Sequence, residues 1–129
     1  MAHLQTTLDS ARDLTVLTLS DLVTTDDVIG ALRDFYCRTC TSKAVWDFTR
    51  SDLRHAKKED LAAVLSVAKS YAHLRQGGKT ALVVPGDLGF GLCRMYESMA
   101  ELKDHPVGHG VFRTMADALA WLEAPPDPD

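Results

Sequence analysis

Hydrophobic and polar positions change their period along this chain, and each change predicts a new element. The runs Leu4–Leu8 and Leu14–Leu19 are rich in Thr, Val and Leu and are separated by five mostly polar residues, a pattern that predicts a β-hairpin. Residues 24–27 then place capping hydroxyls and carboxylates ahead of apolar positions at helical spacing. Those apolar positions are Val28, Leu32, Phe35 and Tyr36. A first helix therefore follows the hairpin.

The middle of the chain predicts a strand and then a helix. Ala44–Phe48 is a compact apolar run, typical of a buried strand, with Asp47 near its end. From Lys57 onward the apolar residues form one helical stripe that ends before Gly77 and Gly78, and this predicts the longest helix of the chain. The stripe consists of Leu61, Val64, Leu65, Ala68, Tyr71 and Ala72.

The last third repeats this alternation. Thr80–Val84 is β-branched and apolar and stops at a Pro-Gly pair, so we expect it to be the central strand. A third helix is marked by Leu92, Met95, Tyr96 and Met99. Val107–Phe112 predicts the last strand, and Thr114–Asp117 resembles a capping box, with Asp in place of Glu, at the start of a final helix.

The resulting order is ββαβαβαβα. Strands separated by helices indicate an α/β fold with a five-stranded, mostly parallel sheet, to which the N-terminal hairpin adds an antiparallel edge, and four helices. We expect one domain over residues 1–124. Residues 125–129 are rich in Pro and Asp and predict a frayed tail.

Composition excludes several classes of protein. A content of 46% hydrophobic and 25% charged residues is that of an ordinary globular domain. A net charge of -4 gives no attraction to phosphate backbones, so nucleic acid is not an expected partner. The sequence carries neither a secretory signal nor an apolar run long enough to cross a membrane, and the three cysteines suggest no disulfide framework. We expect a cytoplasmic protein with reduced thiols.

Candidate binding residues follow two predicted strands. Ligands of open parallel sheets meet the carboxyl ends of the strands, which here are expected to lead into two loops, residues 47–51 and 85–91. The candidate ligand- or partner-binding residues are Asp47, Thr49, Arg50, Gly86, Asp87, Gly89, Phe90, Gly91 and Arg94. Glycines at a helix start favour an anion. The alternative is that Gly89 and Gly91 allow close packing, while Asp47, Arg50 and Arg94 form local pairs.

Cysteines and histidines supply no catalytic or metal site that the sequence can identify. Cys37 and Cys40 form a Cys-x-x-Cys pair, but a predicted helix carboxyl end disfavours the thiolate, and no second pair completes a metal site. His105 and His109 would lie about 13 Å apart in an extended strand, so we expect surface residues. We expect no cofactor and no metal.

Three segments carry a resemblance to a known family. They are Phe90–Glu97 (Phe-Gly-Leu-Cys-Arg-Met-Tyr-Glu), Val111–Arg113 and Ala118–Leu122. With them the chain resembles the SpoIIAA-like branch of the STAS superfamily. The resemblance implies the fold of anti-sigma-factor antagonists, a remoter kinship to lipid-binding SEC14-like domains, and a bacterial-type family in which most members have no established activity.

The chain departs from that family at one functional element. Antagonists carry a phosphorylatable serine in an Asp-Ser-x-Gly element, whereas this chain reads His55–Glu59 there, without a serine. The resemblance therefore does not extend to the phosphorylation switch, although Thr49 and Ser51 lie in the preceding segment.

We expect a non-catalytic regulatory module that contacts another protein or a second copy of itself, as a homodimer. The alternative is a carrier of a small apolar or lipid ligand, in which methionine and aromatic side chains line a cavity. These side chains are Phe35, Tyr71, Met95, Tyr96, Met99 and Trp121. Their helical spacing is equally typical of an ordinary core. Anion binding and Cys-x-x-Cys redox chemistry are further alternatives.

Overall fold

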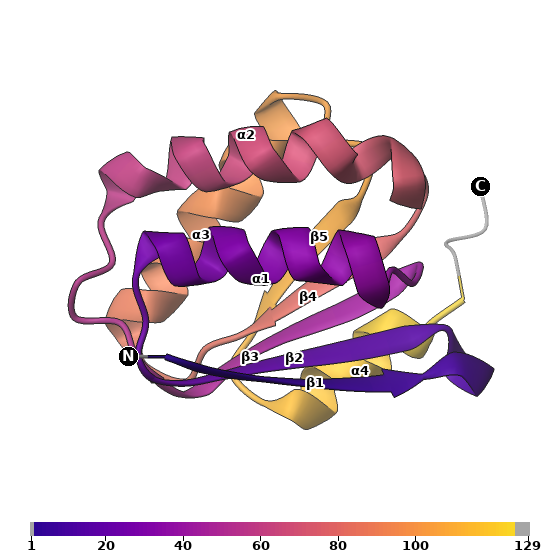
Figure 1. Cartoon of the computed structure of the whole chain (residues 1–129), viewed down its shortest axis with the longest axis horizontal. Coiled ribbons are helices and arrows are strands. Elements are labelled where there is room, and N and C mark those ends of the chain that lie inside the picture. Colours follow the sequence, from indigo (N-terminus) through magenta and orange to yellow (C-terminus); the bar gives the residue numbers. More distant parts are fainter. Residues whose placement is uncertain (1, 126–129) are drawn as a thin grey trace.

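Helices cover both faces of one β-sheet (Figure 1). The computed structural model describes residues 2–125, so the predicted tail falls outside the described residues except for Pro125. Within this range the sheet has five strands in the order β1-β2-β3-β4-β5. They are β1 (His3–Asp9), β2 (Leu14–Leu22), β3 (Lys43–Asp52), β4 (Lys79–Val83) and β5 (Gly108–Phe112). Only β1 and β2 pair antiparallel, and the other neighbours are parallel, as the sequence predicts.

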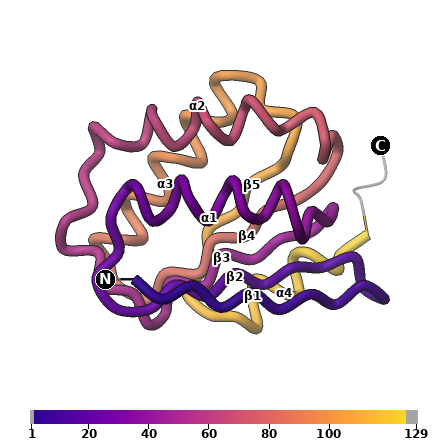
Figure 2. The backbone as a smooth tube through the Cα atoms, in the orientation of Figure 1, coloured from indigo at the N-terminus to yellow at the C-terminus, as the bar shows by residue number. Residues whose placement is uncertain are grey.

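Four α-helices in residues 2–125 complete the predicted order. They are α1 (Thr25–Arg38), α2 (Leu61–Tyr71), α3 (Asp87–Leu102) and α4 (Met115–Glu123). The short 3-10 helices are η1 (Ser10–Arg12), η2 (Lys58–Asp60) and η3 (Ala72–Arg75). Figures 1 and 2 show α1, α2 and α3 on one face of the sheet and α4 on the other. No helix in this part of the chain is long and apolar enough to cross a membrane.

Side chains alternate between two apolar cores, one on each face of the sheet. In β3, Ala44 and Trp46 pack toward the larger core under α1, α2 and α3. Val45, between them, is fully buried in the smaller core under α4. This alternation explains why the strands read as continuous apolar runs, since a parallel sheet covered on both faces has no polar side.

The helix starts follow the capping signals of the sequence. At α1 the Thr24 side chain accepts from the Asp27 backbone N–H, and the Asp27 carboxylate accepts from the Thr24 backbone N–H. This reciprocal pair is a full capping box. At α4 the Thr114 hydroxyl accepts from the Asp117 N–H, and no return bond is formed within the described chain.

Three sequence predictions about the elements are wrong in detail. The central strand is β3, not β4. The longest α-helix is α3, because the helical segment around α2 tightens into 3-10 turns at both ends. The segment 47–51 is not a loop, since β3 continues to Asp52 and pairs with β2 beyond a register shift between Thr18 and Ser20.

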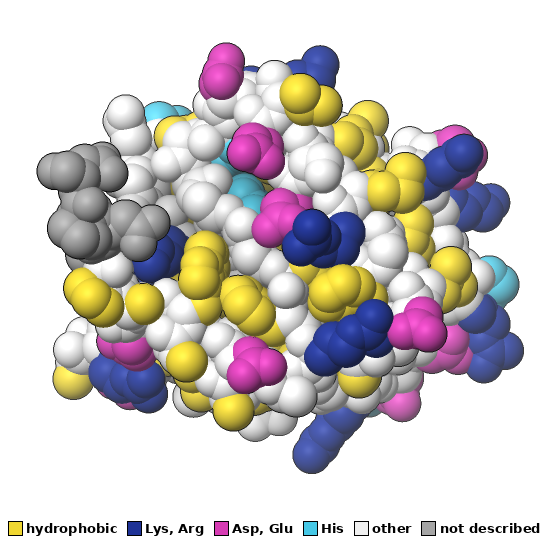
Figure 3. Space-filling model, turned by 180° about the vertical axis from the view of Figure 1, so that it is seen from behind, with side chains coloured by type: hydrophobic (Ala, Val, Ile, Leu, Met, Phe, Trp, Pro, Cys, Tyr) yellow, Lys and Arg dark blue, Asp and Glu magenta, His cyan; other side chains and the backbone are white. Residues whose placement is uncertain are grey.

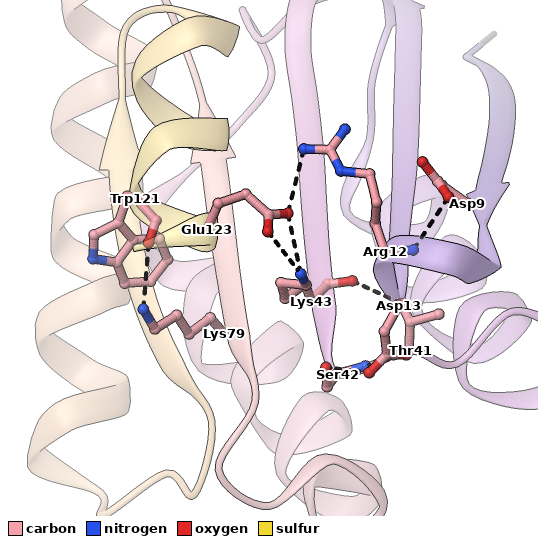
Figure 4. Close-up of polar contacts among 9 residues, drawn as sticks. All are labelled: Asp9, Arg12, Asp13, Thr41, Ser42, Lys43, Lys79, Trp121 and Glu123. Atoms are coloured by element: carbon pink, nitrogen blue, oxygen red, sulfur yellow. Dashed lines mark hydrogen bonds and ion pairs between the residues drawn. The ribbon is translucent and has the colours of Figure 1, made fainter. Parts of the chain in front are cut away.

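Polar contacts fasten α4 beside the hairpin (Figure 4). The Glu123 carboxylate accepts from Lys43 Nζ at 3.1 Å and from Arg12 Nη2 at 3.3 Å. Lys79 Nζ donates to the Trp121 carbonyl at 3.3 Å. These contacts join the amino ends of β3 and β4 to the carboxyl end of α4, and they hold this helix against the sheet.

Candidate functional site

The first predicted segment makes local contacts only. Asp47 Oδ1 accepts from the Thr49 backbone N–H at 2.9 Å and from the Thr49 hydroxyl at 2.7 Å. Thr49 and Arg50 are exposed on the extended end of β3. The Asp47 carboxylate therefore orients the strand end, in line with the local alternative.

The second predicted segment surrounds the start of α3. Gly86 is the N-cap residue of α3, so the first turn of this helix has no side-chain cap. Arg113 Nη1 donates to Asp87 Oδ1 at 2.8 Å and to the Pro85 carbonyl at 3.0 Å, and its guanidinium lies 4.2 Å from the centroid of the Phe90 ring. The Asp87 carboxylate at the start of α3 is therefore already paired with the Arg113 guanidinium.

The remaining predicted residues divide between packing and surface. A Cβ added at Gly89 would lie 2.6 Å from Val84 Cγ1, so this glycine permits close packing of α3 on the sheet. Gly91 faces open space. Arg94 Nε lies 3.5 Å from Glu97 Oε1, one turn away on the same helix; Arg94 is exposed and Glu97 is half-buried. Within residues 2–125, no polar contact joins the candidate residues around the start of α3 to those of the segment 47–51. A role of these residues in binding therefore stays a prediction.

A cavity of about 140 Å³ lies between the sheet and helices α1, α2 and α3. Most of its wall is apolar, and its lining residues come from all three helices, from β3, β4 and β5, and from the segments that connect them. The apolar lining consists of Val23, Val28, Leu32, Phe35, Trp46, Phe48, Leu53, Leu61, Val64, Ala68, Leu82 and Leu92. The sequence had suggested six lining candidates, of which Phe35 and Tyr96 line this cavity. Trp121 packs on the opposite face, and Met95 is exposed.

Exposure of the lining residues locates the mouth of the cavity. Thr24, before α1, and Lys57, before η2, are exposed, whereas Ala56 and Asp60 are half-buried. At the opposite end Arg75 and Thr80 are almost fully buried. The cavity therefore opens between the start of α1 and the segment 53–60, and it ends in polar side chains.

Arg75 forms the charged part of that polar end. It is 6% exposed and donates five hydrogen bonds, all to uncharged groups. The acceptors are the carbonyls of Thr41, Ser42 and Lys79 and the hydroxyls of Tyr36 and Thr80. Its guanidinium also lies 5.0 Å from the Phe35 ring centroid. No carboxylate belongs to this set, so within residues 2–125 no ion pair neutralises the positive charge at the closed end of the cavity.

Two histidines complete the polar end. Their ring centroids are 4.7 Å apart and their planes are nearly perpendicular. The prediction that His105 and His109 lie far apart on the surface is wrong, because β5 begins only at Gly108 and the chain turns before it. Burial is the main cause that lowers the pKa of His109, to about 4, and the nearby His105 adds to it.

Hydrogen bonds to Val107 fix the tautomers of both rings. The Val107 N–H donates to His105 Nδ1 at 3.1 Å, so the proton of neutral His105 lies on Nε2. His109 Nδ1 lies 3.0 Å from the Val107 carbonyl and therefore carries the proton of its own ring. His105 Nε2 is buried and finds no acceptor among residues 2–125. An unpaired buried donor is unfavourable by about 1–3 kcal/mol.

The same histidines line a hollow on the outer surface (Figure 3). There histidine side chains lie at the bottom of a depression bordered by acidic side chains. It is lined by Glu97 and Glu101 from α3, by Val107, and by Gly108 at the start of β5. Within the described residues, no group of three or more potential ligands is placed to hold a metal ion.

The Cys-x-x-Cys pair shows no activated thiol. Cys37 and Cys40 are exposed and free, at the carboxyl end of α1 as predicted. Burial raises the pKa of Cys40, and this outweighs the opposing effect of Arg75. The thiol of Cys93, at the cavity wall, has a pKa raised to about 12 by burial. The thiols of Cys40 and Cys93 are therefore poor nucleophiles at neutral pH.

The polar end could not be found from the sequence. Arg75 stands among polar residues at the end of a helix, where a solvated side chain is the ordinary expectation. Its burial depends on η3 folding back over the amino ends of β3 and β4. An irregular turn before β5 brings the two histidines together, and the spacing of hydrophobic residues cannot predict such a turn.

Comparison with known proteins identifies the fold. No family model matches this sequence, and no curated protein matches it. Among solved structures, the chain is similar to the crystal structure of an uncharacterized DUF3478-family protein with a SpoIIAA-like fold from Shewanella loihica PV-4. The TM-score is 0.57 and the identity 19%, over 95% of each chain. The expected SpoIIAA-like fold is thereby confirmed.

Proposed function

We propose that this SpoIIAA-like domain is a non-catalytic binding module whose ligand is a small, mostly apolar molecule with one oxygen-bearing end. The observation that carries the proposal is the cavity between the sheet and helices α1, α2 and α3, with apolar walls and a polar closed end. Small-molecule sites commonly combine such walls with a few polar groups that orient the ligand. Of the functions considered from the sequence, the carrier fits this geometry best.

The volume sets the size of the ligand. An apolar cavity of about 150 Å³ in another protein takes up benzene, and this one measures about 140 Å³. A single six-membered ring or a short branched chain fits it. A long lipid chain does not fit inside, which narrows the lipid-carrier hypothesis to small ligands.

The polar end sets the chemistry of the ligand. Arg75 brings a positive charge without a carboxylate partner, and His105 Nε2 brings a buried donor without an acceptor. The guanidinium charge favours a negatively charged group nearby, and the imidazole donor favours a hydrogen-bond acceptor. A ring that carries a carboxylate or a carbonyl would satisfy the imidazole donor and lie close to the guanidinium charge.

Binding is favoured over catalysis by the contacts of the candidate nucleophiles. Among residues 2–125 no hydroxyl or thiol hydrogen-bonds to a histidine, and both histidines of the polar end bond to Val107. Nucleophilic catalysis needs such a pair. The thiols of Cys40 and Cys93 have raised pKa values, which adds to this argument.

The first test measures binding of ring compounds by NMR. Titration of isotope-labelled protein with benzoate should shift the amides of residues that line the cavity, and palmitate should not shift them. Ala68 is 4% exposed and lines the cavity, so Ala68→Leu should fill part of it and weaken benzoate binding at least tenfold. Ala62→Leu, on the exposed side of α2, is the matched control and should bind as the wild type does.

The second test addresses the polar end. Toluene has the shape of benzoate without the carboxylate, so it should bind at least tenfold more weakly, because it leaves the buried donor unpaired. His105→Leu should remove most of this difference. Equal affinities for the two compounds in the wild type, or shifts confined to the outer hollow, would contradict the proposal.

Contact with a protein partner, the role expected first from the sequence, has one specific observation in its favour. The outer edge of β1 has no strand partner within residues 2–125.

A further inference from the structure

The outer edge of β1 lacks the features that normally prevent strands from associating. β1 pairs with β2 through all seven of its residues without a register shift, and it ends the sheet of the described chain. Exposed edge strands are usually protected by lysine, proline, a bulge or short length. β1 (His-Leu-Gln-Thr-Thr-Leu-Asp) has none of these. The opposite edge, β5, has five residues, two of them glycines.

Two leucines of β1 are exposed beside this edge. Leu4 is 39% and Leu8 is 51% exposed. Leu4 lies opposite Leu19 in the register, and Leu19 belongs to the larger core. Because side chains two and four residues apart share a face of a strand, both leucines extend that core to the rim of the sheet. They would be covered if another strand were added.

The sequence of β1 is complementary to itself in the antiparallel direction. With a two-fold axis at Thr6, His3 lies opposite Asp9 of a second copy, and Leu4 lies opposite Leu8 of that copy. Gln5 then faces Thr7. All seven residues pair, each end has an imidazole beside a carboxylate, and the leucines meet on one face. A slip by one residue would bring the leucines to opposite faces.

We propose that β1 pairs antiparallel with β1 of a second copy around Thr6, joining the two five-stranded sheets into one continuous sheet. The occupant is a second copy, because the leucines of this strand, and the imidazole and carboxylate at its two ends, match themselves. The interface is a single strand wide, so it belongs to the small, weak class of interfaces. The dimer is therefore concentration-dependent.

Cysteine cross-linking tests the register. In a background of Cys37→Ser and Cys40→Ser, Thr6→Cys brings two thiols together across the axis. Directly opposite residues have Cα atoms about 4.5–5.5 Å apart, which a disulfide spans. Thr7→Cys is the control, because its copies lie on a diagonal about 7–8 Å long. We expect Thr6→Cys to oxidise to a covalent dimer at least fivefold faster, and equal or reversed rates would overturn the proposal.

Sedimentation tests the association itself. Leu4→Lys should move the monomer–dimer equilibrium toward monomer at least tenfold, whereas Leu102→Lys, at the exposed end of α3, should leave it unchanged. His3→Asp, which places a second carboxylate opposite Asp9, should weaken the dimer as well, and its exposed position makes it safe for folding. A wild-type protein that stays monomeric up to roughly 1 mM, a concentration at which even a complex with a Kd of that size would form, would overturn the proposal.

Discussion

Arg75 shows how one residue organises the interior at the closed end of the cavity. Its five hydrogen bonds join the amino ends of β3 and β4 to α1 and η3. A buried charge is tolerated when its donors are satisfied, and here carbonyl dipoles and the Phe35 ring surround it. The same bonds hold the guanidinium in place, so its charge is oriented before any ligand arrives.

At the same scale, His109 should make the protein sensitive to acid. Its pKa is about 4 in the folded protein, whereas an exposed histidine titrates near 6.5. Between these two pH values the unfolded chain binds a proton that the folded chain does not, so the free energy of unfolding falls as pH falls. The gap between the pKa values corresponds to roughly 3 kcal/mol. Urea unfolding at pH 7 and pH 5 should detect about 2 kcal/mol of this, because pH 5 lies about 1.5 units below the pKa of an exposed histidine.

The control for this prediction is another histidine. His109→Gln should flatten the pH dependence in this window, whereas His73→Gln, exposed in η3, should keep it. The groups around His109 that also act on its pKa are His105 and Arg75. An unchanged slope in His109→Gln would assign the acid sensitivity to His105 instead.

At the scale of elements, α3 depends on how closely it can approach the sheet. Gly89 is buried against Val84 and Leu53, and the two glycines of this helix differ sharply in their surroundings. A side chain at Gly89 would meet both neighbours, whereas one at Gly91 would meet open space. The glycine spacing that suggested an anion site therefore has a packing explanation at one of its two positions.

Alanine substitutions separate these two glycines. Gly89→Ala should lower the free energy of unfolding by about 1–3 kcal/mol, because its Cβ would lie 2.6 Å from Val84 Cγ1. Gly91→Ala should raise it by up to about 1 kcal/mol, because alanine favours a helix more than glycine does. Thermal unfolding of both variants checks the prediction, and a similar change in both would show that α3 shifts to accommodate the methyl group.

At the scale of the whole molecule, local signals predicted the fold and missed the site. The Thr24 capping box and the apolar strand runs involve neighbours in sequence, so element order and sheet type could be read from the chain. The order of strands within the sheet depends on where each connecting helix packs, and local signals do not determine this. The sequence therefore did not predict that β3 rather than β4 lies at the centre. Arg75 and His105 meet only after η3 and the turn before β5 have formed.

The two faces of the sheet also differ in how completely they are packed. The face under α4 is closed by well-packed apolar residues and by the Glu123 contacts. The other face is covered by three helices and keeps the cavity. Ligand binding and β1 association are thus predicted for the three-helix side and the sheet edge, while α4 stabilises the scaffold.

The cavity has a last consequence, which concerns hydrostatic pressure. Compression favours whichever state has the smaller volume, and unfolding eliminates internal voids, with volume changes of about 20–100 mL/mol that scale with those voids. Apolar cavities stay dry, so this cavity counts as such a void although it has a mouth. A void of about 140 Å³ in a chain of 129 residues should make this protein easy to unfold by pressure. Tryptophan fluorescence under compression should show a higher midpoint for Ala68→Leu, and for the wild type with benzoate, than for the wild type alone or for Ala62→Leu.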